Sequence, residues 1–232
     1  MFGILLVATS SLLLELSSSF VKTKGLQKEL GVYTFGFLMT LSMPLLFLVM
    51  GVLQNDFHFS YTSLPTILLR IALEMAAVPI AVKAIVATER STHTLIRTIS
   101  IPLLLAIDLI LGYIITNRQM IGMITILIAM IGIFACKQFK KDGVGLTLLA
   151  AIIATATITL YKYNITHYNS IAAEQLIVMT TLAIYFFIVA MIYERNPFPH
   201  LKKLPFMLQS SAYGISGALE SLAYAFAPTS II

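Results

Sequence analysis

The chain has 232 residues, of which 59% are hydrophobic and 11% are charged, and its mean hydropathy is +0.93. Soluble domains carry about 25% charged residues, so this composition excludes an ordinary soluble domain and predicts that lipid surrounds the protein. The net charge of +5 comes mostly from Lys and Arg between apolar runs, which favours a membrane protein over a nucleic-acid-binding one. The single cysteine, Cys136, excludes an internal disulfide and a cysteine-rich metal cluster.

Successive apolar runs follow one another along the chain, each close to the length of about 20 residues that a helix needs to cross a bilayer. We interpret all of them as helices, because a lone strand cannot satisfy its backbone hydrogen bonds in lipid. The sequence therefore predicts an all-α, polytopic transmembrane helix bundle. The runs are Phe2–Val21, Tyr33–Leu53, Leu64–Ala87, Leu95–Ile115, Met120–Cys136, Gly143–Tyr161, Ile171–Tyr193 and Leu204–Ala227.

Prolines and glycines inside the runs predict how these helices bend and pack. Pro44, Pro79 and Pro102 are expected to kink the second, third and fourth helices, because proline donates no backbone hydrogen bond. Gly122 and Gly132 in the fifth run are expected to allow close contact with a neighbouring helix.

A weak internal repeat is visible. A shift of 142 positions aligns Tyr33–Met50 with Gln175–Ile192, and a shift of 140 aligns Leu64-Pro65 with Leu204-Pro205. Unless this is a coincidence among apolar runs, the unit is five helices, and an odd number inverts the second unit relative to the first. We expect a first repeat over residues 1–142 and a second over 143–232, truncated after about three helices, so that about 8 of 10 expected helices are present.

Lys and Arg are distributed unevenly between the loops. Most of them lie in the loops after the first, third, fifth and seventh runs. Positively charged loops tend to stay in the cytoplasm, so the charge distribution alone places the N-terminus outside.

Leu95–Phe134 combines a helix with an early proline, a short polar link at Thr116–Gln119 and a helix with spaced glycines. This segment resembles the fourth and fifth helices of EamA-like proteins, which belong to the drug/metabolite transporter superfamily. The stretches KAIVATERSTHTLIRT and AYAFAPTSII resemble the turn between helices three and four in that family's two repeats. The resemblance implies a transporter with the N-terminus in the cytoplasm, opposite to the orientation that the charges favour, and we leave the orientation open.

Acidic residues lie deep within four separate runs: Glu15, Glu74, Asp108 and Glu220. Each costs about 2.5–3.5 kcal/mol in lipid, so such residues persist where they face a polar interior or perform a function. We expect them to bind a solute or a proton. Glu74 is the leading candidate, about 15 Å into its helix, although Arg70 one turn earlier could simply neutralise it. Asp108 has no polar neighbour in the sequence, and an unpaired buried carboxylate could carry a proton.

Other polar residues receive structural interpretations. Glu174 lies close to the start of its helix and is expected either to cap that end or to extend toward the membrane surface. Lys83 and Arg97 are expected to extend their charged groups toward the membrane surface, with neutralisation of an anionic substrate as the alternative. The four histidines fall in or near loops and share no helix face, so no metal site is expected. Asn164–Thr166 matches the glycosylation sequon, a match that is frequent by chance.

No catalytic or nucleotide-binding motif is present in the sequence: it contains no phosphate-binding glycine loop, HExxH or GxSxG. We therefore expect no enzyme and no cofactor. The resemblance to EamA-like proteins implies a secondary transporter that moves a small metabolite or drug-like solute by alternating access. The expected location is the cell (plasma) membrane, as a multi-pass protein. Expected partners are a small-molecule solute and membrane lipid, with a proton or other coupling ion and a homodimer as further candidates, and no nucleic acid. The alternatives are an integral-membrane enzyme acting on a lipid and a non-transporting membrane scaffold.

Overall fold

The computed structural model describes residues 2–23, 30–110, 112, 117–136, 142–194 and 196–224. Most of these residues are helical, the rest form turns and short irregular segments, and no strand occurs among them, which confirms the all-α prediction. The helices are α1 (Phe2–Thr23), α2 (Val32–Thr40), α3 (Ser42–Gln54), α4 (Leu64–Ala87), α5 (Arg90–Arg97), α6 (Ser100–Ile110), α7 (Asn117–Cys136), α8 (Val144–His167), α9 (Ile171–Tyr193), α10 (Phe198–Leu201) and α11 (Leu204–Ala223), with a 3₁₀ turn, η2, at Tyr61–Ser63.

Three segments of the described chain are long and apolar enough to cross a membrane. They are α8, α9 and the α2–α3 segment Val32–Gln54. The expectation of a membrane protein is therefore supported at this level, by helix length and composition.

Two of the three prolines coincide with breaks in the helices. The α2–α3 segment is interrupted at Leu41, and the α5–α6 segment between Arg97 and Ser100. Each break lies about one turn before a proline, Pro44 or Pro102, because proline removes a backbone donor and crowds the carbonyl four residues earlier. By contrast, α4 continues through Pro79 as one helix.

The expected boundaries need correction on both sides of the fourth run. The fourth run is expected to begin at Leu95, but the chain is already helical from Arg90. The predicted link at Thr116–Gln119 is largely helical, because α7 begins at Asn117. The sixth helix also continues past Tyr161 to His167. The polar residues that flank these apolar runs can also adopt helical structure, so the helices extend beyond the ends of the runs.

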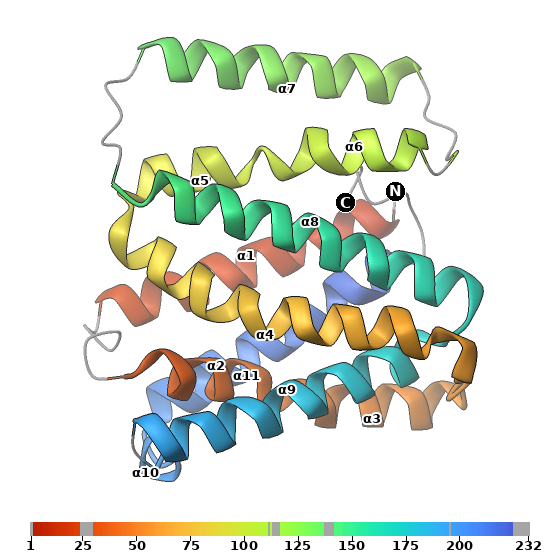
Figure 1. Ribbon diagram of the computed structural model, residues 1–232, viewed down its shortest axis with the longest axis vertical. Coiled ribbons are helices and arrows are strands. Elements are labelled where there is room, and N and C mark those ends of the chain that lie inside the picture. Colours follow the sequence, from red (N-terminus) through yellow and green to blue (C-terminus); the bar gives the residue numbers. More distant parts are fainter. Residues whose placement is uncertain are drawn as a thin grey trace.

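The helices lie roughly side by side, and α7 occupies the outer edge next to α6 (Figure 1). The closest helix pairs are α1 with α11 and α4 with α8, and α9 packs against both α2 and α3. Helix α11 also packs against α2 and α3, and α4 against α9. The predicted packing role of Gly122 and Gly132 is not seen, because no atom of the described structure lies within 4 Å of the position that a Cβ would take at either residue.

The hydrophobic core lies between α2, α4, α9 and α11, around Phe37, Ile67, Leu182, Phe186 and Phe206. Many large apolar side chains instead face outward, while Arg70, Asp108 and Glu174 are buried. A bundle with an apolar exterior and charged residues inside is the arrangement expected of a protein in lipid.

Candidate functional site

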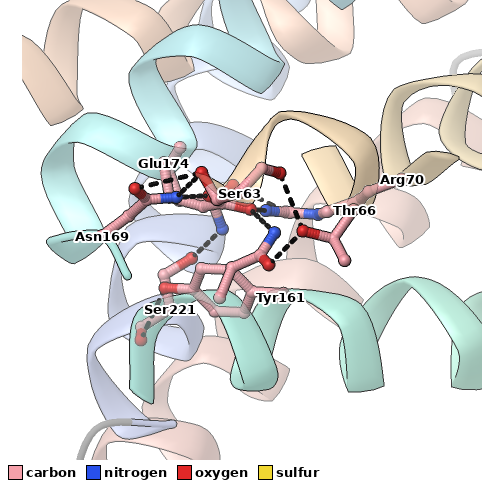
Figure 2. A network of polar contacts seen from close by, with 9 residues as sticks. Ser63, Thr66, Arg70, Tyr161, Asn169, Glu174 and Ser221 are labelled. Atoms are coloured by element: carbon pink, nitrogen blue, oxygen red, sulfur yellow. Dashed lines mark hydrogen bonds and ion pairs between the residues drawn. The ribbon is translucent and has the colours of Figure 1, made fainter. Parts of the chain in front are cut away.

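A buried ion pair joins α4 to α9. Nη1 of Arg70 lies 3.0 Å from Oε1 of Glu174, and the two side chains are 3% and 0% exposed. Arg70 lies in the second turn of α4 and Glu174 at the start of α9, so the pair is near the N-terminal end of both helices. Figure 2 shows the pair at the centre of a set of polar contacts.

Both oxygens of the Glu174 carboxylate are hydrogen-bonded. In addition to Arg70, Asn164 donates to Oε1 at 2.8 Å and Asn169 donates to Oε2 at 2.6 Å. The two amides are held in turn, because Oδ1 of Asn164 accepts from Thr66 at 2.6 Å and Oδ1 of Asn169 accepts from the backbone of Ser60 at 2.9 Å. This pairing is what a charge needs in order to be buried.

The guanidinium of Arg70 extends the network to α8 and α11. Its Nη2 donates to Oε1 of Gln175 at 2.8 Å, and Nε2 of Gln175 donates to Oγ of Ser221 at 2.7 Å. The Tyr161 hydroxyl donates to the carbonyl of Ser221 at 3.2 Å. The Tyr161 ring also lies below the guanidinium, with Cζ 4.5 Å from the ring centroid, a cation–π contact. The network therefore links α4, α8, α9 and α11 (Figure 2).

These contacts correct two expectations from the sequence and agree with the interpretation of the sequon as a chance match. The ion-pair partner of Arg70 within the described residues is Glu174, not Glu74. Glu174 binds another helix instead of capping its own, where Ser170 supplies the N-cap. Asn164 is fully buried against Glu174, so its sequon cannot accept a glycan in this fold. Polar residues clustered at the α8–α9 turn, between two long apolar helices, were the available signal for this site.

Glu74 of α4 and Glu220 of α11 come from different helices, are both half-buried, and interact electrostatically. Arg70 acts most strongly on Glu74 electrostatically, Thr157 of α8 provides a side-chain hydrogen bond to it, and Glu220 acts on it more weakly. The hydroxyl of Tyr224 donates to Oε1 of Glu220 at 3.2 Å. Two neighbouring carboxylates repel each other, and a proton or a cationic group between them relieves that repulsion.

The other two predicted acids have different surroundings. Asp108 is 1% exposed on α6, and it interacts electrostatically with Lys162 of α8, so the expectation of an unpaired carboxylate is wrong. The amine of Lys162 also donates to the backbone carbonyl of Tyr224. Glu15 belongs to α1, but its side chain lies outside the described part of the structure.

A cavity of about 580 Å³ opens at the α8–α9 turn, a volume typical of small-molecule sites. Asp56, His58, Lys162 and His167 give its wall a mixed polar character. Asn169 belongs both to this wall and to the ion-pair network, where it donates to Glu174. Asn169 therefore connects the cavity wall directly to the buried ion pair.

Within the described residues, no group of three His, Cys, Asp or Glu side chains is arranged to hold a metal ion. The arrangement consists of acids, amides and hydroxyls on helices that meet in the interior. Comparison with known proteins shows no match to a family model and no significantly similar curated protein.

Proposed function

We propose that this protein is an integral membrane secondary transporter that moves a small metabolite or drug-like solute by alternating access, as its resemblance to EamA-like proteins implies. Glu74 and Glu220 are the proposed solute- or proton-binding groups, and Asp108 and Glu15 are further candidates. The proposed setting is a multi-pass protein of the cell (plasma) membrane, without a catalytic step or cofactor.

The observation that carries this proposal is that Glu74 and Glu220, on helices from the two halves of the chain, are close enough to interact electrostatically. Both acids lie on apolar helices, where a charged side chain costs free energy, so such residues are retained mainly where they have a function. They come from opposite halves of the sequence, so a solute or proton between them would contact both proposed repeats. A relative movement of the two halves would then change the surroundings of the bound group, as alternating access requires.

The helix pairs support the proposed inverted repeats over residues 1–142 and 143–232. In the alignment of the repeats, α1 corresponds to α8, the α2–α3 segment to α9, and α4 to α11. This exchange converts the α1–α11 pair into the α8–α4 pair, and the contacts of α11 with α2 and α3 into those of α4 with α9. The contact between the α2–α3 segment and α9 maps onto itself. Such reciprocity is expected of two units related by a two-fold axis.

Transport assays in proteoliposomes test the function. The wild-type protein is reconstituted with an imposed proton gradient, and uptake is measured for a panel of radiolabelled amino acids, nucleosides and organic cations. We expect uptake of at least one class, and we expect Glu74→Gln and Glu220→Gln to lower that uptake by about tenfold or more, which corresponds to the loss of about 1.4 kcal/mol of interaction.

The matched control is Glu89→Gln, which neutralises an exposed carboxylate between α4 and α5. If the Ala and Gln variants of Glu15, Glu74, Asp108 and Glu220 all transport normally, the assignment of the site is wrong. If the wild-type protein moves none of these solutes under any gradient, the proposal of transport loses its support.

A further inference from the structure

Helix α9 carries a carboxylate near each end. Glu174 lies in its first turn, and Glu194 follows its last residue, 20 positions later in the sequence. At 1.5 Å per residue, the two residues are separated by about 30 Å along the helix, which is about the thickness of the bilayer hydrocarbon. The two carboxylates therefore mark opposite faces of the membrane.

Glu174 closes the face at which α9 begins. It binds Arg70 of α4, and the adjoining turn is attached to the loop before α4 by two further bonds. The backbone N–H of Ser170 donates to the carbonyl of His58 at 2.8 Å, and the Ser170 hydroxyl donates to the carbonyl of Asp56 at 3.0 Å. All of these contacts join the first half of the chain to the second, and Ser170, His58 and Asp56 themselves line the cavity at the α8–α9 turn.

Glu194 makes the corresponding connection at the other face. Its two carboxylate oxygens accept from the backbone N–H groups of Tyr33 at 2.9 Å and Thr34 at 2.8 Å, at the start of α2. A carboxylate is favourable there because the first N–H groups of a helix lack partners and carry partial positive charge. Gly31 permits this approach, since a Cβ at that position would collide with the Glu194 carboxylate.

We propose that these two carboxylates are the gates of the transport path. The Arg70–Glu174 ion pair, which is bonded to the cavity wall through Asn169, closes the path from the cavity to Glu74 and Glu220. The Glu194 contact with α2 closes the opposite face. The inference rests on the proposed function and assigns its two gates. The two contacts join the same halves of the protein, and each opens in turn while the other holds.

The chemistry of the ion pair suits a contact that opens and closes. Charges buried together add little net stability over apolar residues of the same shape, so a buried ion pair is retained more readily for a switching role than for stability. Nε of Arg70 is buried and has no hydrogen-bond partner among the described residues, so the guanidinium retains a donor for a new partner.

The test measures access to the interior from each face. Thr157 is 4% exposed, lies near the middle of α8 and contacts Glu74. In a Cys136→Ser background, Thr157→Cys is labelled with a membrane-impermeant thiol reagent in sealed vesicles of either orientation. Gate variants are then compared with the parent by their rates of labelling from the two faces.

Each gate variant should raise the rate at which Thr157→Cys is labelled from one defined face of the membrane. Glu174→Gln should raise labelling from the cavity face by about tenfold, the expected effect of losing a hydrogen bond to a charged group. Glu194→Gln and Gly31→Ala, which removes the room for the Glu194 carboxylate, should raise labelling from the opposite face. Arg70→Lys, which keeps the charge but loses the fork that reaches Glu174 and Gln175, is the second variant if Glu174→Gln does not fold.

Glu89→Gln should change neither rate. Three outcomes in folded gate variants would contradict the assignment of the two gates. They are labelling that rises from the wrong face, labelling that rises equally from both faces, and labelling that stays at the parent rate. The assay needs no solute, so the two proposals fail separately. If the wild-type protein takes up solute but every variant is labelled at the parent rate, only the assignment of the gates is wrong. If the variants are labelled from one face as expected but no solute is taken up, the proposed transport function is wrong.

Discussion

Nη1 of Arg70 and Oε1 of Glu174 lie 3.0 Å apart, although 104 positions separate the two residues in the chain. The contact ties the second turn of α4 to the first turn of α9 and gathers amides and hydroxyls from α8 and α11 around it. Because both charges are buried, the loss of either one leaves the other without compensation inside the bundle.

Removal of one charge from this pair should destabilise the protein strongly. We expect Glu174→Gln to lower the free energy of unfolding by about 3–5 kcal/mol, because Arg70 remains buried without a counter-charge. Equilibrium unfolding in detergent micelles, followed by circular dichroism, measures the difference. The double variant Arg70→Met with Glu174→Leu should recover most of the loss, and Glu89→Gln should change stability by less than about 0.5 kcal/mol. A Glu174→Gln protein as stable as the wild type would contradict this prediction.

The contact between α1 and α11 depends on two serines that bond each other reciprocally. The Ser10 hydroxyl lies 2.8 Å from the Ser216 hydroxyl, and each hydroxyl is 3.0 Å from the other residue's carbonyl oxygen. Interhelical hydrogen bonds in membranes contribute about 0.6 kcal/mol on average, up to about 1.7. We expect each single Ala variant to lose a value in that range and the double variant to lose less than the sum. Ser211→Ala, on the exposed side of α11, is the control, and strictly additive losses would show that the serines do not interact.

Close packing of α11 against α3 depends on Gly214. A Cβ at this position would collide with the Ser42 hydroxyl and lie 3.0 Å from Cδ1 of Leu46. We expect Gly214→Ala to destabilise the protein by about 1–3 kcal/mol, because the methyl group overpacks this contact. Gly122→Ala is the matched control in open space on α7, where the gain in helix propensity should leave stability unchanged or raise it by up to about 1 kcal/mol. Thermal unfolding in the same detergent compares the two, and equal effects would contradict the packing argument.

The two interior acids should act together in transport. If Glu74 and Glu220 hold the same proton or solute, Glu74→Gln removes most of the activity, and adding Glu220→Gln lowers uptake little further. If the two acids act independently, the fold-loss of uptake in the double variant should equal the product of the two single fold-losses. Uptake rates of the single and double variants under one proton gradient decide between these outcomes, with Glu89→Gln as the control for a change in surface charge.

Much of the helical framework follows from local properties of the chain. The predicted bounds Leu64–Ala87 and Ile171–Tyr193 agree with α4 and α9, because each apolar run is flanked by polar residues. Pro44 and Pro102 likewise locate two helix breaks, since the missing backbone donor acts within one turn. The bounds of α5, α7 and α8 were less accurate, because polar residues continue those helices beyond the apolar runs.

The sequence by itself determined an all-helical bundle with an apolar exterior and a small number of acids placed inside it. Hydropathy and helix breakers suffice for this, because they act over a few residues. Only the tertiary structure decided the partners of these acids. It paired Arg70 with Glu174 instead of Glu74, placed Lys162 near Asp108, and brought Glu220 into the surroundings of Glu74. Such pairings depend on which helix faces meet across the bundle, and spacing along one helix carries no information about that.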